Sequence, residues 1–291
     1  MIIKDSFSKF TNISKLSGCI AFFVNEKLEI THLKKYLSNL DHKNLSKLLK
    51  NKNKKKGLLS FDLNPNQRIV LISLKKNQKP NETEKNGAKL TDFLSSEGAS
   101  VIHIVSDTIS VSLKTDAIYD FLHGMRLKSY SFDRYKSKKE SNILKVNITS
   151  SKKFNKKIYD RFKGIELGVN YTKDLVSEPG NILHPDEYAK RLTQLKKIGL
   201  KVFFSHSVTS IYGRNLVKYV EVAPITSDGL DVSSMPFKIY VDLVAMSGGW
   251  SPSVNLFSQS GGKLTWDEEL GCFKPHVHFQ KEKSIGGSWE N

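Results

Sequence analysis

The sequence predicts an α/β fold, in which strands and helices alternate, for the first 204 of its 291 residues. Two observations carry this prediction. The run CIAFFV at 19–24 is almost wholly apolar, as expected of a central strand that is buried on both faces of a sheet. Between 158 and 176, in contrast, apolar residues recur every three or four positions, as they do along one face of a long helix.

The other elements follow from the same two periodicities. An amphipathic helix or helix pair is expected over 33–50, where leucines alternate with lysines. A short helix is expected from 89–93, and Thr115 can cap another helix with Ile118, Phe121, Leu122 and Met125 on one face. The polar runs at 51–57 and 75–87 predict exposed loops. Strands are expected at 57–63, 68–74, 99–105, 108–113, 142–148 and 200–204.

The long helix has a clear end. The predicted core-facing seam of this helix, the line of residues spaced three or four apart on one face, consists of Ile158, Phe162, Ile165, Val169, Thr172 and Val176. Pro179-Gly180 stops it, Asn181 suits a left-handed turn, and Pro185 suits the first turn of the next helix. These residues predict a hinge between two domains that organises the fold and performs no chemistry.

The composition changes near Phe204. Residues 205–291 hold 7 Lys/Arg and 9 Asp/Glu, so the first 204 residues hold 39 and 20 and carry a net charge of +19. Beyond this point only 238–246 reads as a strand, while SGGWSPS, SQSGGK and SIGGSWEN read as turns. Such a density of loops argues against a compact domain over the last 87 residues.

Features that would place the chain in a membrane or an oxidising compartment are lacking. The two cysteines, Cys19 and Cys272, are too few for a disulfide framework. The first residues do not read as a signal peptide, and the longest apolar run is far short of a membrane span. A soluble cytoplasmic protein is therefore expected.

Two blocks resemble the leucyl (cytosol) aminopeptidase family of dinuclear metallopeptidases. FLHGMRLKSYSFDRYKSKKE at Phe121–Glu140 is similar to the family's helix that ends in a glycine and its Tyr-x-Phe-Asp-x-Tyr-Lys segment. The matching positions are Gly124, Tyr130, Phe132, Asp133, Tyr135 and Lys136. The second block, at 168–185, is similar to Gly-Val-Asn, Arg-Asp-Leu-Val, Glu-Pro-x-Asn and Thr-Pro, with Lys173 in place of Arg and His184 in place of Thr.

The resemblance implies a macro-like amino-terminal α/β domain with a mixed sheet and flanking helices. A long linker helix and an incomplete second α/β unit follow it. It also implies metal-dependent release of amino-terminal residues from peptides, with two divalent metals, zinc or manganese, held by a Lys, three Asp and a Glu. The oligomeric state stays open.

The family's metal-binding blocks are not found in the tail. FSQSGG at 257–262 has Gln259 where the metal-binding Asp would stand, and no Lys-Gly pair precedes it. TSDGLD at 226–231 lies in the wrong order and lacks the Glu and Arg. Cys272, His276 and His278 lack a fourth zinc ligand, and 267–269 reads as a solvated acidic turn. Neither a serine-nucleophile elbow nor a phosphate-binding glycine loop occurs. We therefore expect no catalytic, cofactor-binding or metal-binding residues.

The sequence thus divides into an aminopeptidase-like α/β domain (1–150), a linker helix with the start of a catalytic domain (151–204) and an atypical tail (205–291). We expect the tail to be poorly ordered or read from a shifted frame, and the protein to be a truncated or degenerate, inactive relative of the family. The alternative hypothesis is a DNA-binding module, in which the basic first 204 residues contact phosphates.

Overall fold

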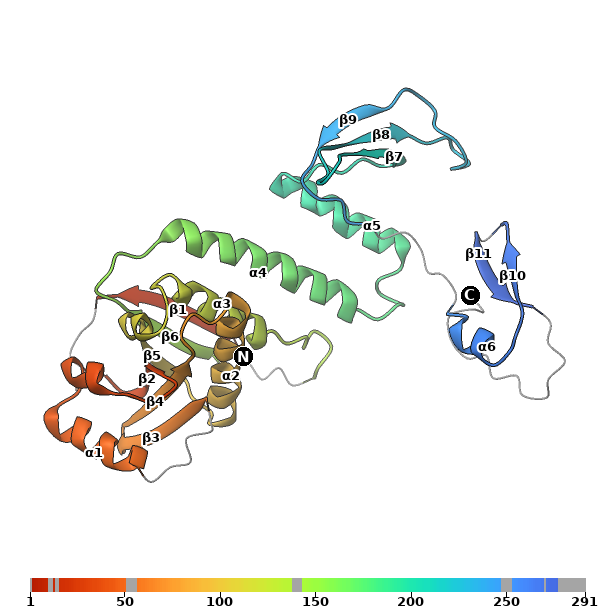
Figure 1. Cartoon of the computed structure of the whole chain (residues 1–291). Coiled ribbons are helices and arrows are strands. Elements are labelled where there is room, and N and C mark those ends of the chain that lie inside the picture. The colour runs from red at the N-terminus through yellow and green to blue at the C-terminus, as the bar shows by residue number, and fades with distance from the viewer. Residues whose placement is uncertain are drawn as a thin grey trace. The chain divides into compact units, whose positions relative to one another are not determined.

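The computed structural model describes residues 2–9, 13, 16–50, 57–137, 143–246, 253–269 and 271–276. The chain forms two units, Met1–Gln194 and Leu195–Asn291. The first is built on a six-stranded sheet in the order β1-β6-β5-β2-β4-β3 (Figure 1). Five strands are parallel to their neighbours, and β3 pairs antiparallel with β4. The strands are β1 (Ile2–Ser8), β2 (Gly18–Asn25), β3 (Leu58–Asn64), β4 (Gln67–Leu74), β5 (Val101–Val105) and β6 (Ile143–Thr149).

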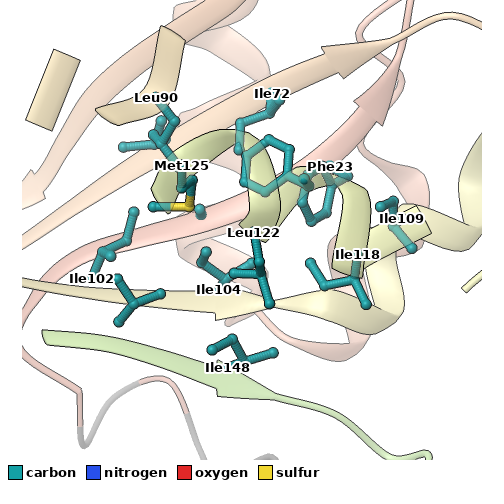
Figure 2. Packing of buried hydrophobic residues seen from close by; sticks show 14 of the residues in the cluster. Phe23, Ile72, Leu90, Ile102, Ile104, Ile109, Ile118, Leu122, Met125 and Ile148 are labelled. Carbon is teal, nitrogen blue, oxygen red and sulfur yellow. The ribbon is translucent and has the colours of Figure 1, made fainter. Parts of the chain in front are cut away.

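Helices cover both faces of the central strands. The helical segments of this unit are η2 (Thr31–Lys35), α1 (Asn39–Lys50), α2 (Pro80–Ser96), η3 (Ser106–Val111), α3 (Ala117–Ser129), α4 (Lys156–Ser177) and α5 (Pro185–Gln194). One face of the sheet packs against α2, α3 and α4, and the other packs against η2 and α1. Phe23 in β2 lies in the first core and Phe22 in the second, which explains why this strand is apolar throughout. Figure 2 shows the first core, where Leu122 and Met125 of α3 lie over Ile102 and Ile104 of β5.

Several sequence expectations are confirmed in this unit. Strands occur where 19–24, 57–63, 68–74, 99–105 and 142–148 predicted them, and a 22-residue helix follows the last of these. The predicted loop at 51–56 lies outside the described residues.

The predicted strand at 108–113 is wrong, because this segment is the 3-10 helix η3. Hydroxyl groups fold the chain back on itself here. Thr108 Oγ1 donates to the carbonyl of Val105 (2.6 Å) and accepts from the amide of Phe23 (2.9 Å). Ser110 Oγ likewise donates to the carbonyl of Asp107 (2.7 Å). Such local bonds compete with a strand ladder.

The predicted loop at 75–87 is also wrong in its second half, because α2 begins at Pro80. Two start signals explain the helix. Pro80 occupies the first turn, and Glu82 Oε2 accepts from the amide of Lys79 at 3.0 Å. Thr115 is not a cap either; α3 begins after Asp116, and no side chain caps it.

The predicted seam of α4 faces the core only at its start. Ile158 and Phe162 pack on the first core, whereas Ile165 is 43% exposed and Val176 is 80% exposed. The buried side instead includes Glu166, which is 4% exposed. Glu166 forms a buried ion pair with Arg126 of α3 at 2.8 Å, and this pair helps to set which side of α4 faces the sheet.

The second unit contains a three-stranded antiparallel sheet of β7 (His206–Tyr212), β8 (Tyr219–Pro224) and β9 (Phe237–Tyr240). It also holds η4 (Leu195–Ile198), α6 (Asn255–Gln259) and the hairpin of β10 (Leu264–Asp267) and β11 (Cys272–Pro275). In its described part, the buried apolar residues are Val220, Val222 and Ala223 alone, so this sheet has a thin core.

These strands correct the description of the tail. The predicted strand at 200–204 is not formed, because Ser205 has a φ of +53° and the extended chain begins only after it. The strand expected at 238–246 is confined to β9, and β7 and β8 were not expected at all. The turn-like runs at 247–252 and 284–291 lie outside the described residues.

Candidate functional site

The two sequence blocks that carry the family resemblance meet in space at the end of α4. Tyr130, directly after α3, donates its hydroxyl to Asp174 Oδ1 at 2.7 Å. Lys173 Nζ donates to the carbonyl of Leu127 at 3.3 Å and lies 5.0 Å from the centre of the Tyr130 ring. The two sequence blocks thus contact each other through Tyr130 of the first block and Lys173 and Asp174 of the second.

Glu178 is the centre of this junction. Its side chain has no exposed surface and accepts from Tyr135, Arg134 and Arg191, the last at 3.0 Å. The hydrogen bond from Tyr135 outweighs burial and, with Arg191 and Arg134, lowers the pKa of Glu178. Arg191 also donates to Glu187 at 3.1 Å. We call Tyr130, Arg134, Tyr135, Asp174, Glu178 and Arg191 the hinge cluster.

The chain turns sharply after Glu178. The amides of Ile182 and Leu183 both donate to the carbonyl of Pro179 at 2.9 Å, and α5 begins at Pro185 as predicted. Asn181 does not adopt the left-handed conformation expected for it. The turn is closed by these carbonyl contacts instead.

A second network of charges joins α4 to the sheet. Arg126 in α3 donates to Asp5 of β1 and, at 2.8 Å, to Glu166 of α4. Glu166 Oε1 also lies 3.0 Å from His123 Nδ1, and the hydroxyl of Tyr159 donates to both oxygens of Asp5 at 3.0 Å. Arg126, Asp5 and Glu166 are each less than a tenth exposed. We call this the core network.

Burial alters the acidity of groups in the core network. Burial opposes ionisation of Asp5, but the charge and hydrogen bonds of Arg126 and the hydrogen bond of Tyr159 prevail and lower the pKa of this carboxyl. Burial and the charge of Asp5 raise the pKa of Tyr159 to about 12. In both clusters the charges are held in fixed pairs that join one element to another.

Gly124 of the first block has a packing role. The resemblance places it at a helix end, but it lies inside α3, which continues to Ser129. A Cβ atom added at Gly124 would lie 1.9 Å from the carbonyl oxygen of Glu84, and one at Gly87 would lie 2.0 Å from that of Phe121. The two glycines therefore allow α2 and α3 to pack backbone against backbone.

Among the described residues that were candidates for metal binding, Asp267 and Cys272 are cross-strand partners in the β10–β11 hairpin. Gln259 ends α6, while Asp228 lies in a turn beyond β8, where Thr226 and the amide of Leu230 lower its pKa. His276 Nδ1 lies 2.9 Å from Thr265 Oγ1, and Asp267 pairs with Lys274. His278 lies outside the described residues.

Within the residues that the structure describes, no group of three or more His, Cys, Asp or Glu is placed to hold a metal ion. The described residues thus offer no donor set for the two-metal centre that the family resemblance implies, and we derive no step through such a centre. None of the helices in the described ranges is long and apolar enough to cross a membrane.

Only part of this geometry could be predicted from the sequence. Tyr130, Tyr135, Lys173 and Glu178 were found through the resemblance, whereas Arg126, Glu166 and Asp5 gave no local signal, because each acts through a partner on another element. The spacing of Glu187 and Arg191, four positions apart on a helix, was a usable signal for their pairing.

The first unit is thus an α/β domain with a six-stranded mixed sheet and helices on both faces. Residues 21–139 match the family model described as the cytosol aminopeptidase family, N-terminal domain. Residues 21–139 of this chain are therefore similar to the amino-terminal domain of the cytosol aminopeptidase family.

Individual relatives agree with this assignment. A probable cytosol aminopeptidase of Phytoplasma australiense is 36% identical over 107 residues, which cover 36% of this chain and 22% of that protein. One from Rhizobium johnstonii is 35% identical over 155 residues, which cover 47% and 29%. The chain thus matches less than a third of the length of these relatives.

A solved structure shows the same fold. A mutant tomato leucine aminopeptidase superposes with a TM-score of 0.51 and 16% identity, over 77% of this chain and 51% of that one. At this identity the likeness concerns the fold alone.

Proposed function

We propose that this chain is a truncated or degenerate cytosol aminopeptidase-like protein whose amino-terminal domain positions a linker helix and whose 291 residues do not hydrolyse peptides. The observation that supports the positioning of the linker helix is the burial of Glu178 between Arg134, Tyr135 and Arg191. These partners join the loop after α3 to both helices of the hinge. The role of the domain is then structural, since it holds α4 and α5 in one orientation relative to each other.

The absence of turnover rests on the sequence of the tail. Hydrolysis by two metal ions requires several carboxylate oxygens that converge from rigid elements. The neutral amide of Gln259 supplies no anion where FSQSGG resembles one ligand block, and TSDGLD at 226–231 lacks the Glu and Arg of the other. The composition change near Phe204 supports a tail that comes from a shifted frame or an unrelated join.

Two measurements test this proposal. Leucine p-nitroanilide, with added Mn²⁺ or Zn²⁺, should give no release of nitroaniline above the blank, while an active aminopeptidase in the same buffer does. Release that depends on the metal and stops with a chelator would contradict the proposal. If neither alternative reading frame of the gene beyond codon 204 encodes the metal-binding blocks, the frameshift origin of the tail is wrong.

DNA binding is a second candidate function, favoured by the net charge of +19 over the first 204 residues. Contacts to phosphates alone would make the affinity fall steeply with salt. A gel-shift titration of duplex DNA against salt concentration should then give a linear log–log plot with a steep slope. Lack of retardation even at low salt would remove this candidate.

A further inference from the structure

A cavity of about 630 Å³ lies where the parallel strands β1 and β6 end. Ser8 and Ser150, at and just beyond the carboxyl ends of these strands, line it together with Ser106, which follows β5. The start of α3 closes another side through Thr115 and Ile118. Ligands of parallel α/β sheets bind at this edge, outside the carboxyl ends of the strands. The volume is that of a small-molecule site.

The rim of the cavity is strongly basic. Among the described residues that line it are four lysines, Lys9, Lys114, Lys152 and Lys153, and one carboxylate, that of Asp116. Asp107, close by, already accepts hydrogen bonds from Ser150 Oγ (2.9 Å) and from the amide of Ser151 (2.8 Å). The excess of positive charge therefore remains for an anion.

The inner wall of the cavity is apolar and aromatic. The rings of Phe7 and Phe154 have their centres 3.9 Å apart, and both are only partly buried. Buried Tyr119 lies behind Phe154, with ring centres 6.1 Å apart, and its hydroxyl accepts from the amide of Asn155 at 2.7 Å. The exposed portions of these rings offer a surface on which a flat base can stack.

The loops around the cavity are held in place before any ligand arrives. Lys152 Nζ donates to Thr115 Oγ1 at 2.7 Å, which joins the loop after β6 to the loop before α3. Asp107 fixes Ser150 and Ser151 from the third side. A site formed in advance loses little conformational entropy on binding.

We propose that this cavity binds a nucleoside phosphate, with the phosphates among the lysines of the rim and the base against Phe7 and Phe154. Inorganic phosphate alone would use only the rim, whereas a nucleoside would use only the wall. The juxtaposition of both surfaces in one cavity favours a ligand that carries both groups. This inference concerns a site apart from the hinge cluster and does not depend on the proposed function.

Calorimetric titration of the full chain with ADP tests the proposal. Saturable binding with one site per chain is expected. The double variant Lys114→Gln/Lys153→Gln should weaken it by about tenfold or more, because two charge-assisted contacts are lost. Lys152 is left intact, since it holds Thr115. The matched control Lys34→Gln/Lys43→Gln removes the same charge from η2 and α1, on the other face of the sheet, and should leave ADP affinity within about twofold.

A third variant separates the base from the phosphates. Phe154→Leu should weaken binding of ADP but not that of pyrophosphate, since only ADP carries a base to stack. The proposal is overturned if ADP does not bind, if both lysine pairs weaken it equally, or if Phe154→Leu leaves ADP affinity unchanged. Thermal unfolding of each variant identifies a loss of binding caused by unfolding, in which case Phe154→Tyr replaces Phe154→Leu and must restore binding.

Discussion

The hydroxyl of Tyr130 donates a 2.7 Å hydrogen bond to the carboxylate of Asp174, a residue 44 positions further along the chain. Each of these residues belongs to one of the two blocks by which the chain resembles aminopeptidases. The pairing gives a physical reason for the two motifs, because each block supplies the partners of the other. The same holds for Tyr135 and Glu178.

Glu178→Gln should loosen the hinge without unfolding the domain. The amide keeps the size of the side chain but removes the charge that faces Arg134 and Arg191. Hydrogen exchange followed by mass spectrometry should show faster exchange over 130–137 and 182–194, while β2 and β4 keep their protection. Unchanged exchange in both hinge segments would show that Glu178 does not hold them.

Gly124→Ala should destabilise the amino-terminal unit by about 1–3 kcal/mol, because the added methyl group would collide with the backbone of Glu84. Gly168→Ala is the matched control, since a Cβ atom there meets nothing within 4 Å and the position lies within α4. That change should stabilise the unit by roughly 0.5–1 kcal/mol. Urea unfolding followed by circular dichroism measures both, and equal effects would refute the close packing of α2 and α3.

Arg126→Met should cost about 3–5 kcal/mol, because it leaves the buried carboxylates of Asp5 and Glu166 without their shared cation. Lys156→Ala removes one partner of the exposed pair with Asp160 and should cost less than about 0.5 kcal/mol. The two variants are compared in the same urea titration. A small cost for Arg126→Met would mean that the core network does not hold α4 to the sheet.

The stability of the amino-terminal unit should decrease in acid partly through Asp5. The pKa of this carboxyl is lowered in the folded state, so its contribution is fully present above its unfolded pKa of about 3.9 and is lost as the pH falls through the folded value. As the pH is lowered from 5, the free energy of unfolding of Asp5→Asn should therefore decrease less steeply than that of the unchanged protein. Parallel pH profiles of the two proteins would contradict the role of Asp5.

Local periodicity predicted the strands that form the two cores, because β2 and β4 are buried on both faces and read as apolar runs. It missed β1, in which Ile3 and Phe7 alternate with polar residues and Asp5 faces inward to Arg126. A polar residue on the inner face breaks the pattern of an edge strand, and only its distant partner explains it.

The junctions could be predicted only where a motif marked them. Glu178 lies in the Glu-Pro-x-Asn motif of the second block, but its three partners come from positions that only the fold brings together. In the second unit β7 was missed because most of its side chains are exposed and give no strong apolar signal. The strand β8 was missed although Val220, Val222 and Ala223 are buried, because its run is only six residues long.

Equilibrium binding of Mn²⁺ to the full chain, measured by the loss of the free-ion electron paramagnetic resonance signal, tests the central claim most directly. A chain without converging carboxylates should leave the free Mn²⁺ signal undiminished at micromolar concentrations of protein and metal. Uptake of two ions per chain, removed by a chelator, would contradict the account.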